Sequence, residues 1–211
     1  MAEIVRLTES SDWIDLGFVQ RERTPKPLME LGIRLHLAGL SLSDTVSELE
    51  KFGVERSRKA VHDWVHKADI GTDETTSPDQ VALDETVVKI DGEIFRLYSA
   101  VDPATNETLL TRLYSTRTTV LTQRFIAELR AEHDVEDATF LVDGAPWLQT
   151  ALDRCALAYR HETVGDRTAV ERVYTEVKRQ TSSFENTFRQ ADPKTAENWL
   201  VSQATWLNAR N

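Results

Sequence analysis

Two aspartates lie where a carboxylate could do chemistry rather than face water. Asp84 sits inside residues 81–90, an apolar run with the length and composition of a buried strand. Asp143 directly follows a second such run, residues 138–142, and precedes Gly144. A carboxylate among apolar side chains costs free energy unless it is paired or binds a metal. Asp84 is therefore a candidate functional group, whereas Asp143 taken alone could equally be a turn residue.

A third acid, Glu171, falls in the first turns of a segment with a helical pattern, residues 167–180. Carboxylate oxygens with open water positions suit Mg²⁺ or Mn²⁺. Two such ions can serve phosphoryl transfer, one activating the attacking oxygen and the other stabilising the leaving oxygen. The chain order of two strand aspartates and one helix glutamate therefore predicts a catalytic, metal-binding triad, Asp84, Asp143 and Glu171, with two ions of Mg²⁺ or Mn²⁺.

Basic residues follow the glutamate on the same segment. Lys178 lies seven residues after Glu171, two helical turns along one face. Lys178 could contact DNA phosphate beside the metals, or it could be a solvated lysine on the helix surface. The residues alone favour neither interpretation. Arg172 and Arg179 add positive charge that could bind phosphate.

Other acids are interpreted as structural or solvated. Glu85 should point to the sheet face opposite Asp84 because side chains alternate along a strand. Asp102 ends a strand, and Asp91 and Asp134 lie in turns.

Residues 81–211 alternate between strand and helix patterns. Strands are predicted at 81–90, 93–101, 107–114, 138–142 and 157–161, and helices at 118–133, 146–155, 167–180 and 193–209. Asp91-Gly92 is a strong hairpin turn signal. Three antiparallel strands followed by helix-linked parallel strands indicate an α/β fold, a mixed sheet flanked by helices with ribonuclease-H-like topology. In that topology the first and fourth strands are neighbours, so Asp84 and Asp143 can share a metal.

A small all-α domain is predicted at residues 25–68, after an arm at 1–24 and before a polar linker at 69–80. Its helices are expected over 28–40, from an N-cap at Ser43 to a stop at Gly53, and after an N-cap at Ser57. This pattern indicates a helix-turn-helix. Its candidate DNA contacts are Arg56, Arg58, Lys59, His62 and Lys67. The alternative is a helical hairpin that binds nothing.

Composition indicates the kind of environment in which the protein functions. The net charge is −10, and the 25 basic residues comprise 7 Lys and 18 Arg. A lysine-poor acidic surface is typical of proteins in concentrated salt, where charge repulsion is screened, although a plain acidic protein with a local basic patch would look similar. There is no signal peptide pattern, no membrane-length apolar run and only one cysteine, Cys155. We therefore expect a cytoplasmic protein without a membrane partner.

The segments VALDETVVKI, FLVDGA and AVERVYTEVKR, together with the helix-turn-helix, resemble the DDE transposases of insertion sequences. The chain is most similar to the insertion-sequence-six family in its haloarchaeal branch, from about residue 20 to the C-terminus. The resemblance implies that Asp84, Asp143 and Glu171 are the catalytic triad and that Lys178 is the basic residue that follows the glutamate. One departure is that only 27 residues separate Asp143 from Glu171, fewer than in the family's bacterial members.

The resemblance also implies the reaction and the partners. The helix-turn-helix would bind the terminal inverted repeats of double-stranded DNA. Metal-dependent cleavage at the element's ends and attack on target DNA would give a cointegrate, with a homo-oligomer pairing the two ends. Two alternatives stay open: a transposase-derived DNA-binding protein that no longer cuts, and a ribonuclease-H-like nuclease that hydrolyses DNA without joining strands.

Overall fold

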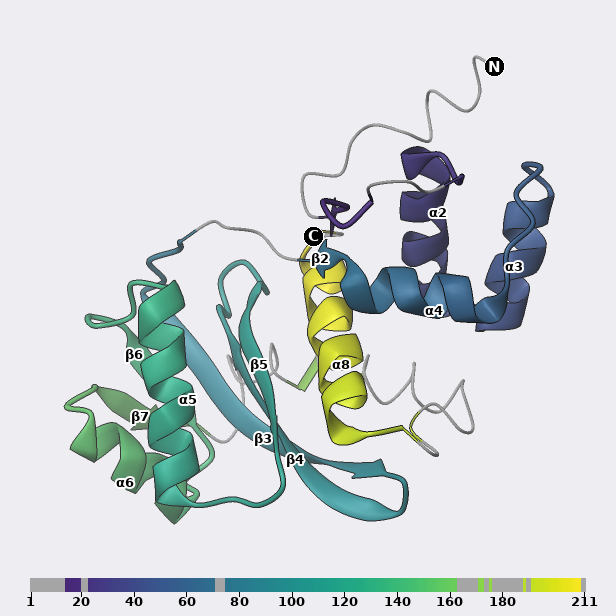
Figure 1. The fold of residues 1–211 in the computed structure, drawn as a ribbon. Coiled ribbons are helices and arrows are strands. Elements are labelled where there is room, and N and C mark those ends of the chain that lie inside the picture. The colour runs from purple at the N-terminus through teal and green to yellow at the C-terminus, as the bar shows by residue number, and fades with distance from the viewer. Residues whose placement is uncertain are drawn as a thin grey trace. The chain divides into compact units, whose positions relative to one another are not determined.

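The computed structural model describes residues 14–19, 23–70, 75–162, 171–172, 175, 188 and 191–209. The chain divides into two compact units, residues 1–72 and 73–211, and each is considered by itself (Figure 1). None of the helices in these ranges is both long enough and apolar enough to span a bilayer.

The described part of the first unit contains three helices and a two-stranded sheet. Its elements are β1 (Ile14–Asp15), α2 (Lys26–Leu37), α3 (Leu42–Glu50), α4 (Arg58–Lys67) and β2 (Asp69–Ile70). The three helices contact one another around a buried core of Met29, Ile33, Leu37, Leu49, Val61 and Trp64. β1 pairs antiparallel with β2, so part of the expected N-terminal arm and part of the expected linker form a small sheet.

Two helices in this unit begin directly after a serine whose side chain caps the helix N-terminus. Ser57 Oγ accepts a hydrogen bond from the Ala60 N–H and caps α4, as predicted. The predicted N-cap of α3 at Ser43 is wrong. Ser41 occupies that position and accepts from the Asp44 N–H, because Leu42 already has helical geometry. Sequence reasoning could not separate two serines two residues apart, since both have the hydroxyl that capping needs.

The second unit is built on a five-stranded mixed sheet. Its strands are β3 (Gln80–Ile90), β4 (Glu93–Val101), β5 (Thr108–Tyr114), β6 (Thr139–Val142) and β7 (Tyr159–His161), in the order β5-β4-β3-β6-β7. β3, β4 and β5 pair antiparallel, whereas β3–β6 and β6–β7 pair parallel. The mixed sheet is as predicted, and the first and fourth strands of the unit are neighbours, as the ribonuclease-H-like topology requires.

Helices cover both faces of this sheet (Figure 1). They are α5 (Thr119–Glu132), α6 (Pro146–Arg154) and α8 (Pro193–Asn208). α5 and α6 pack on the face that carries Val81 and Leu83, where they bury Phe125 and Leu148. α8 contributes to the core on the opposite face, which carries Ala82. Alternate residues of β3 therefore belong to two separate cores.

α8 also covers the backbone of the edge strand β5. The Asn208 side chain accepts a hydrogen bond from the Thr108 N–H (2.7 Å) and donates one to the Thr108 carbonyl (2.8 Å). Near the other end of the helix, Glu197 Oε1 accepts from the Leu113 N–H at 3.1 Å. These contacts pair backbone groups that an edge strand would otherwise present to another chain.

Candidate active site

The pairing of β3 with β6 brings Asp84 and Asp143 to the same level of the sheet. Gln80 lies beside Thr139 and Ala82 beside Leu141. Asp143 directly follows the end of β6, and the same register continued by two residues would place it beside Asp84. Since Ala82 and Leu141 share the core on the α8 face, the alternation of side chains directs both carboxylates to that face. Neighbouring strands lie about 4.8 Å apart, so both groups could ligate one ion.

Backbone amides hold both carboxylates. Asp84 Oδ1 accepts a hydrogen bond from the Glu85 N–H at 2.7 Å, and Asp143 Oδ1 accepts from the Ala145 N–H at 3.0 Å. Asp84 is only 8% exposed, whereas Asp143 is exposed. The Asp84 carboxylate is thus buried within the sheet, whereas the Asp143 carboxylate is accessible to solvent.

Gly144 shapes the turn that carries Asp143. Its φ is +80°, in the left-handed region where a side chain is strained. A Cβ atom there would also lie 2.9 Å from Nε2 of His161, at the end of β7. The left-handed backbone therefore favours glycine directly after Asp143, and a side chain there would push the exposed His161 ring aside.

The remaining predicted site residues are only partly placed. Glu171 is helical and exposed. Arg172 is exposed and donates from Nη1 to Asn106 Oδ1 at 2.6 Å. Lys178 and Arg179 lie outside the described residues. Within the described ranges, no three His, Cys, Asp or Glu side chains come close enough together to hold a metal, so Glu171 is not grouped there with Asp84 and Asp143.

The opposite face of the sheet carries a charged cluster that the sequence did not indicate. Glu85 points there, as the alternation predicts, and its side chain is only 8% exposed. Its Oε1 lies 3.1 Å from Nη1 of Arg117 and 3.6 Å from Nη1 of Arg96. The Arg117 guanidinium in turn lies over the Trp147 ring, 4.2 Å from its centroid. Burial and, to a smaller extent, the Glu85 carboxylate raise the pKa of nearby Tyr98.

Arg117 and Trp147 were both missed by sequence reasoning. The available signal was weak, consisting of a basic residue just before the N-cap Thr118 and an aromatic residue four positions after Asp143.

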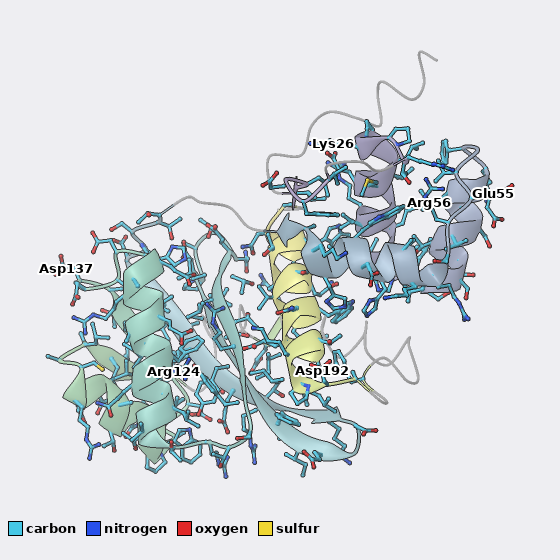
Figure 2. The ribbon with its side chains drawn as sticks, viewed as in Figure 1. Lys26, Glu55, Arg56, Arg124, Asp137 and Asp192 are labelled. Carbon is cyan, nitrogen blue, oxygen red and sulfur yellow. The ribbon has the colours of Figure 1, made fainter. Side chains whose placement is uncertain are left out.

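The predicted DNA contacts of the first unit fall on and just before α4. Arg58 and Lys67 are exposed. Lys59 pairs with Asp63 at 3.1 Å, which lowers the pKa of Asp63, and His62 Nδ1 lies 3.5 Å from the same carboxylate. Arg56, labelled in Figure 2, is half-buried and donates to Thr24 Oγ1 at 2.7 Å and to the Glu55 carbonyl at 2.8 Å. Arg56 therefore has a structural role within the unit, whereas the other basic residues lie nearer the surface.

Comparison with known protein families identifies the family to which the chain belongs. Residues 78–197 match the IS240-type family whose model is described as a DDE domain. This match spans more than half of the chain, so the protein belongs to the DDE domain family and is a DNA phosphoryl-transfer enzyme. The matched family is one of transposases.

The chain also resembles a curated protein over nearly its whole length. It is 27% identical over 198 residues to the uncharacterised protein MJ0017 of Methanocaldococcus jannaschii, covering 92% of each chain.

Two solved structures are similar to the chain at low sequence identity. The catalytic core of HTLV-2 integrase with magnesium is 13% identical, with a TM-score of 0.44 over 63% of this chain and 87% of that one. The Mos1 transposase paired-end complex is 12% identical, with a TM-score of 0.40 over 93% and 79%.

Proposed function

We propose that the protein is the transposase of an insertion sequence similar to the insertion-sequence-six family, in its haloarchaeal branch. The observation that carries the proposal is that Asp84 lies on β3 and Asp143 directly follows β6, two strands that pair in parallel inside the segment that matches the DDE domain family. In this reading the enzyme cuts DNA at the element's ends and joins the freed 3′ ends to a target, which yields a cointegrate.

The donor set of the paired aspartates fits a hard divalent cation. Both groups offer carboxylate oxygens, and one oxygen of each is held in place by a backbone amide. Asp84 and Asp143 would hold Mg²⁺ or Mn²⁺, and Glu171 would complete the set from its helix. A bound ion of this kind neutralises charge that develops on phosphate oxygens during phosphoryl transfer. The protein's own part is to place the carboxylates on two strands that a shared core keeps in register.

The first unit would then supply DNA recognition. A helix-turn-helix made of α3 and α4 would place α4 in the major groove of the terminal inverted repeats. Arg58 and Lys67 would contact phosphates, because they are exposed on a helix whose pattern of charge is locally basic in an acidic protein. Lys178, Arg172 and Arg179 would contact DNA near the metals. Two copies, each bound to one end of the element, would bring the ends together.

A catalytically inactive DNA-binding descendant is the second candidate. It would keep the fold and α4 but would not need the acids. The presence of all three acids, Asp84, Asp143 and Glu171, favours the enzyme.

The test is strand cleavage and joining on a labelled duplex that carries the end of the element encoding this chain. Reactions run in several molar KCl with Mg²⁺ or Mn²⁺ and compare the wild type with Asp84→Asn and Asp143→Asn. Asp102→Asn is the matched control. This acid lies in a turn of the same unit, where its Oδ1 accepts from the Ala104 N–H, and an asparagine can keep that bond.

Metal-dependent joining by the wild type and the Asp102 variant, lost in both site variants, is expected. Cleavage without joining would indicate a nuclease instead. Specific binding of the end by a folded wild type that neither cuts nor joins would establish the inactive DNA-binding candidate.

A further inference from the structure

We propose that Glu85, Arg117 and Trp147 form a positioning bridge on the far side of the sheet that sets the separation of Asp84 and Asp143. This inference rests on the proposed function, because it assigns the bridge to the metal-binding pair. It adds three residues that do not touch the reacting atoms.

The bridge begins at Asp84. The residue that follows, Glu85, holds Asp84 Oδ1 through its backbone N–H while its side chain projects to the opposite face. A change in the position of Glu85 would therefore move the amide that orients the Asp84 carboxylate. The Glu85 side chain is 8% exposed, so its charge needs a partner in the protein.

Arg117 forms the middle of the bridge. Its guanidinium is 3.1 Å from Glu85 Oε1 and at the same time lies over the Trp147 ring. A planar, delocalised guanidinium can make an ion pair at its edge while it stacks flat on a ring with its face, whereas a lysine ammonium is a compact point charge that cannot stack. The chain separation between Arg117 and Glu85 is 32 residues, so this contact ties the start of α5 to β3.

The bridge ends at Asp143. Trp147 is in the first turn of α6, and the N-cap residue of that helix, Ala145, donates its N–H to Asp143 Oδ1. Gly144 has no side chain with which to fix the loop. The stacking of Arg117 on Trp147 therefore anchors the helix turn from which the Asp143 carboxylate is held.

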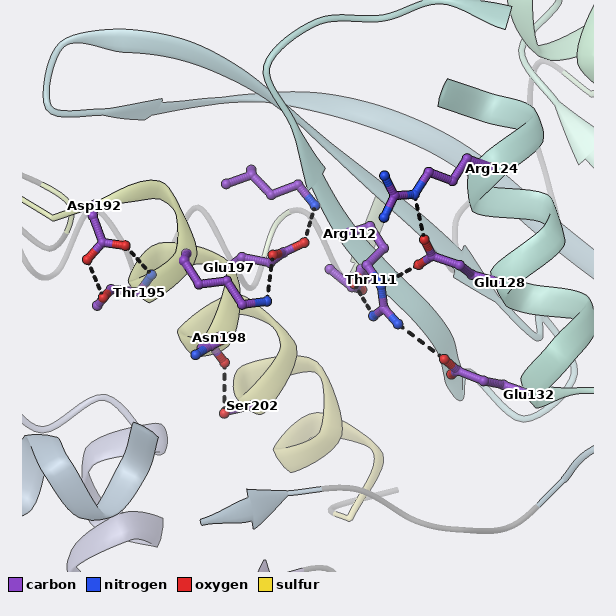
Figure 3. A network of polar contacts seen from close by, with 12 residues as sticks. Thr111, Arg112, Arg124, Glu128, Glu132, Asp192, Thr195, Glu197, Asn198 and Ser202 are labelled. Carbon is purple, nitrogen blue, oxygen red and sulfur yellow. Dashed lines mark hydrogen bonds and ion pairs between the residues drawn. The ribbon is translucent and has the colours of Figure 1, made fainter. Parts of the chain in front are cut away.

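The simpler interpretation is that the Glu85–Arg117 ion pair only stabilises the fold. Another arginine in the same unit, Arg112, serves for comparison. Arg112 on β5 donates to Glu128 at 2.7 Å and to Glu132 at 3.1 Å on α5 (Figure 3). It also ties a strand to α5, but its partners Glu128 and Glu132 are not residues that hold the Asp84 or Asp143 carboxylate. A stabilising role alone predicts similar consequences for the loss of Arg112 and of Arg117. A positioning role predicts that only Arg117 affects metal binding.

The test measures Mn²⁺ binding to the full chain in concentrated KCl by electron paramagnetic resonance, beside DNA joining and denaturant unfolding. The variants are Arg117→Ala, Arg117→Lys, Glu85→Gln and Trp147→Phe, with Arg112→Ala as the control. Substitution of outer-shell partners typically weakens metal affinity about 10- to 100-fold. We expect a weakening of that order for Arg117→Ala and Arg117→Lys, a smaller one for Glu85→Gln, and near-normal affinity for Trp147→Phe, which keeps an aromatic face.

Arg112→Ala is expected to lower stability while leaving the Mn²⁺ affinity unchanged. The bridge is refuted if folded Arg117→Lys and Glu85→Gln bind Mn²⁺ within about twofold of the wild type, or if Arg112→Ala weakens binding as much as they do. Should Arg117→Ala fail to fold, those two milder variants decide the question.

The two proposals fail separately. Mn²⁺ binding that depends on Asp84 and Arg117, in a wild type that joins no DNA, would keep the bridge and reject the transposase. Joining by the wild type with normal Mn²⁺ binding in the Arg117 variants would reject the bridge alone. A wild type without Asp84-dependent Mn²⁺ binding would reject both.

Discussion

Replacing Gly144 with alanine should damage the site more than the same change at an equivalent backbone position. Gly144 and Gly92 have φ values of +80° and +85°. Nothing lies within 4 Å of a Cβ atom built on Gly92, whereas at Gly144 that atom would meet the His161 ring at 2.9 Å. The two substitutions therefore share the backbone cost and differ in the collision beside Asp143.

The expected magnitudes follow from this difference. A left-handed alanine costs about 1–2 kcal/mol, which is the whole expected effect of Gly92→Ala. His161 is exposed, so its ring can turn aside at a cost of about 0.5–1.5 kcal/mol, and Gly144→Ala should lower the free energy of unfolding by about 1.5–3.5 kcal/mol. If the turn moves instead, Asp143 moves with it, and a displacement of about 1 Å can reduce activity about 100-fold.

Denaturant unfolding and metal-dependent DNA joining would be measured for both single variants and for Gly144→Ala combined with His161→Ala. Removing the ring should leave only the backbone cost, so the double variant should approach the stability of Gly92→Ala and recover most of the joining activity. His161→Ala alone is the control for loss of the ring. Equal effects of the two glycine substitutions, or no recovery in the double variant, would refute the argument that His161 confines the turn.

Two further predictions concern stability. Asn208→Ala removes the hydrogen-bond partner of both backbone groups of Thr108 and should lower the free energy of unfolding by about 2 kcal/mol, measured with denaturant. Asn198→Ala, in the same helix, is the control and should change it by less than about 0.5 kcal/mol. Equal effects of the two substitutions would contradict the contact of Asn208 with the edge strand. Burial lowers the pKa of His36 below 6.5, although its hydrogen bond to Leu40 acts in the opposite direction. As the pH falls, His36 is therefore protonated in the unfolded state at a higher pH than in the folded state. Stability of the first unit should then fall as pH drops below about 6.5, measured by hydrogen exchange in α2, and His36→Gln should flatten that dependence.

Much of the fold was predictable because local patterns and topology agree. The apolar runs around Asp84 and before Asp143 specify strands, and Asp91-Gly92 specifies the hairpin, with φ values of +47° and +85°. The antiparallel then parallel order of strands left few arrangements, and the ribonuclease-H-like one makes the strands of the two aspartates neighbours.

The features that the sequence did not predict depend on contacts between residues far apart in the chain. Arg117 and Glu85 are 32 residues apart, and neither has a sequence pattern that distinguishes it from other surface charges. The contact of α8 with β5 joins residues 100 apart through an ordinary asparagine, Asn208. The grouping of Glu171 with the two aspartates remains a prediction, because it requires a helix to return over the sheet and no local pattern fixes where it lands.

The contact of α8 with β5 has a consequence for the protein while it is being made. Thr108 and Leu113 leave the ribosome long before Glu197 and Asn208, so the nascent sheet must wait with its β5 edge exposed. Any product truncated before α8 would retain that edge permanently, together with the apolar face that Trp199 and Leu200 cover. Such fragments should pair edge to edge with one another or with full-length copies during their synthesis. Until α8 has been synthesised, the sheet therefore has an edge and an apolar face through which the chain could aggregate.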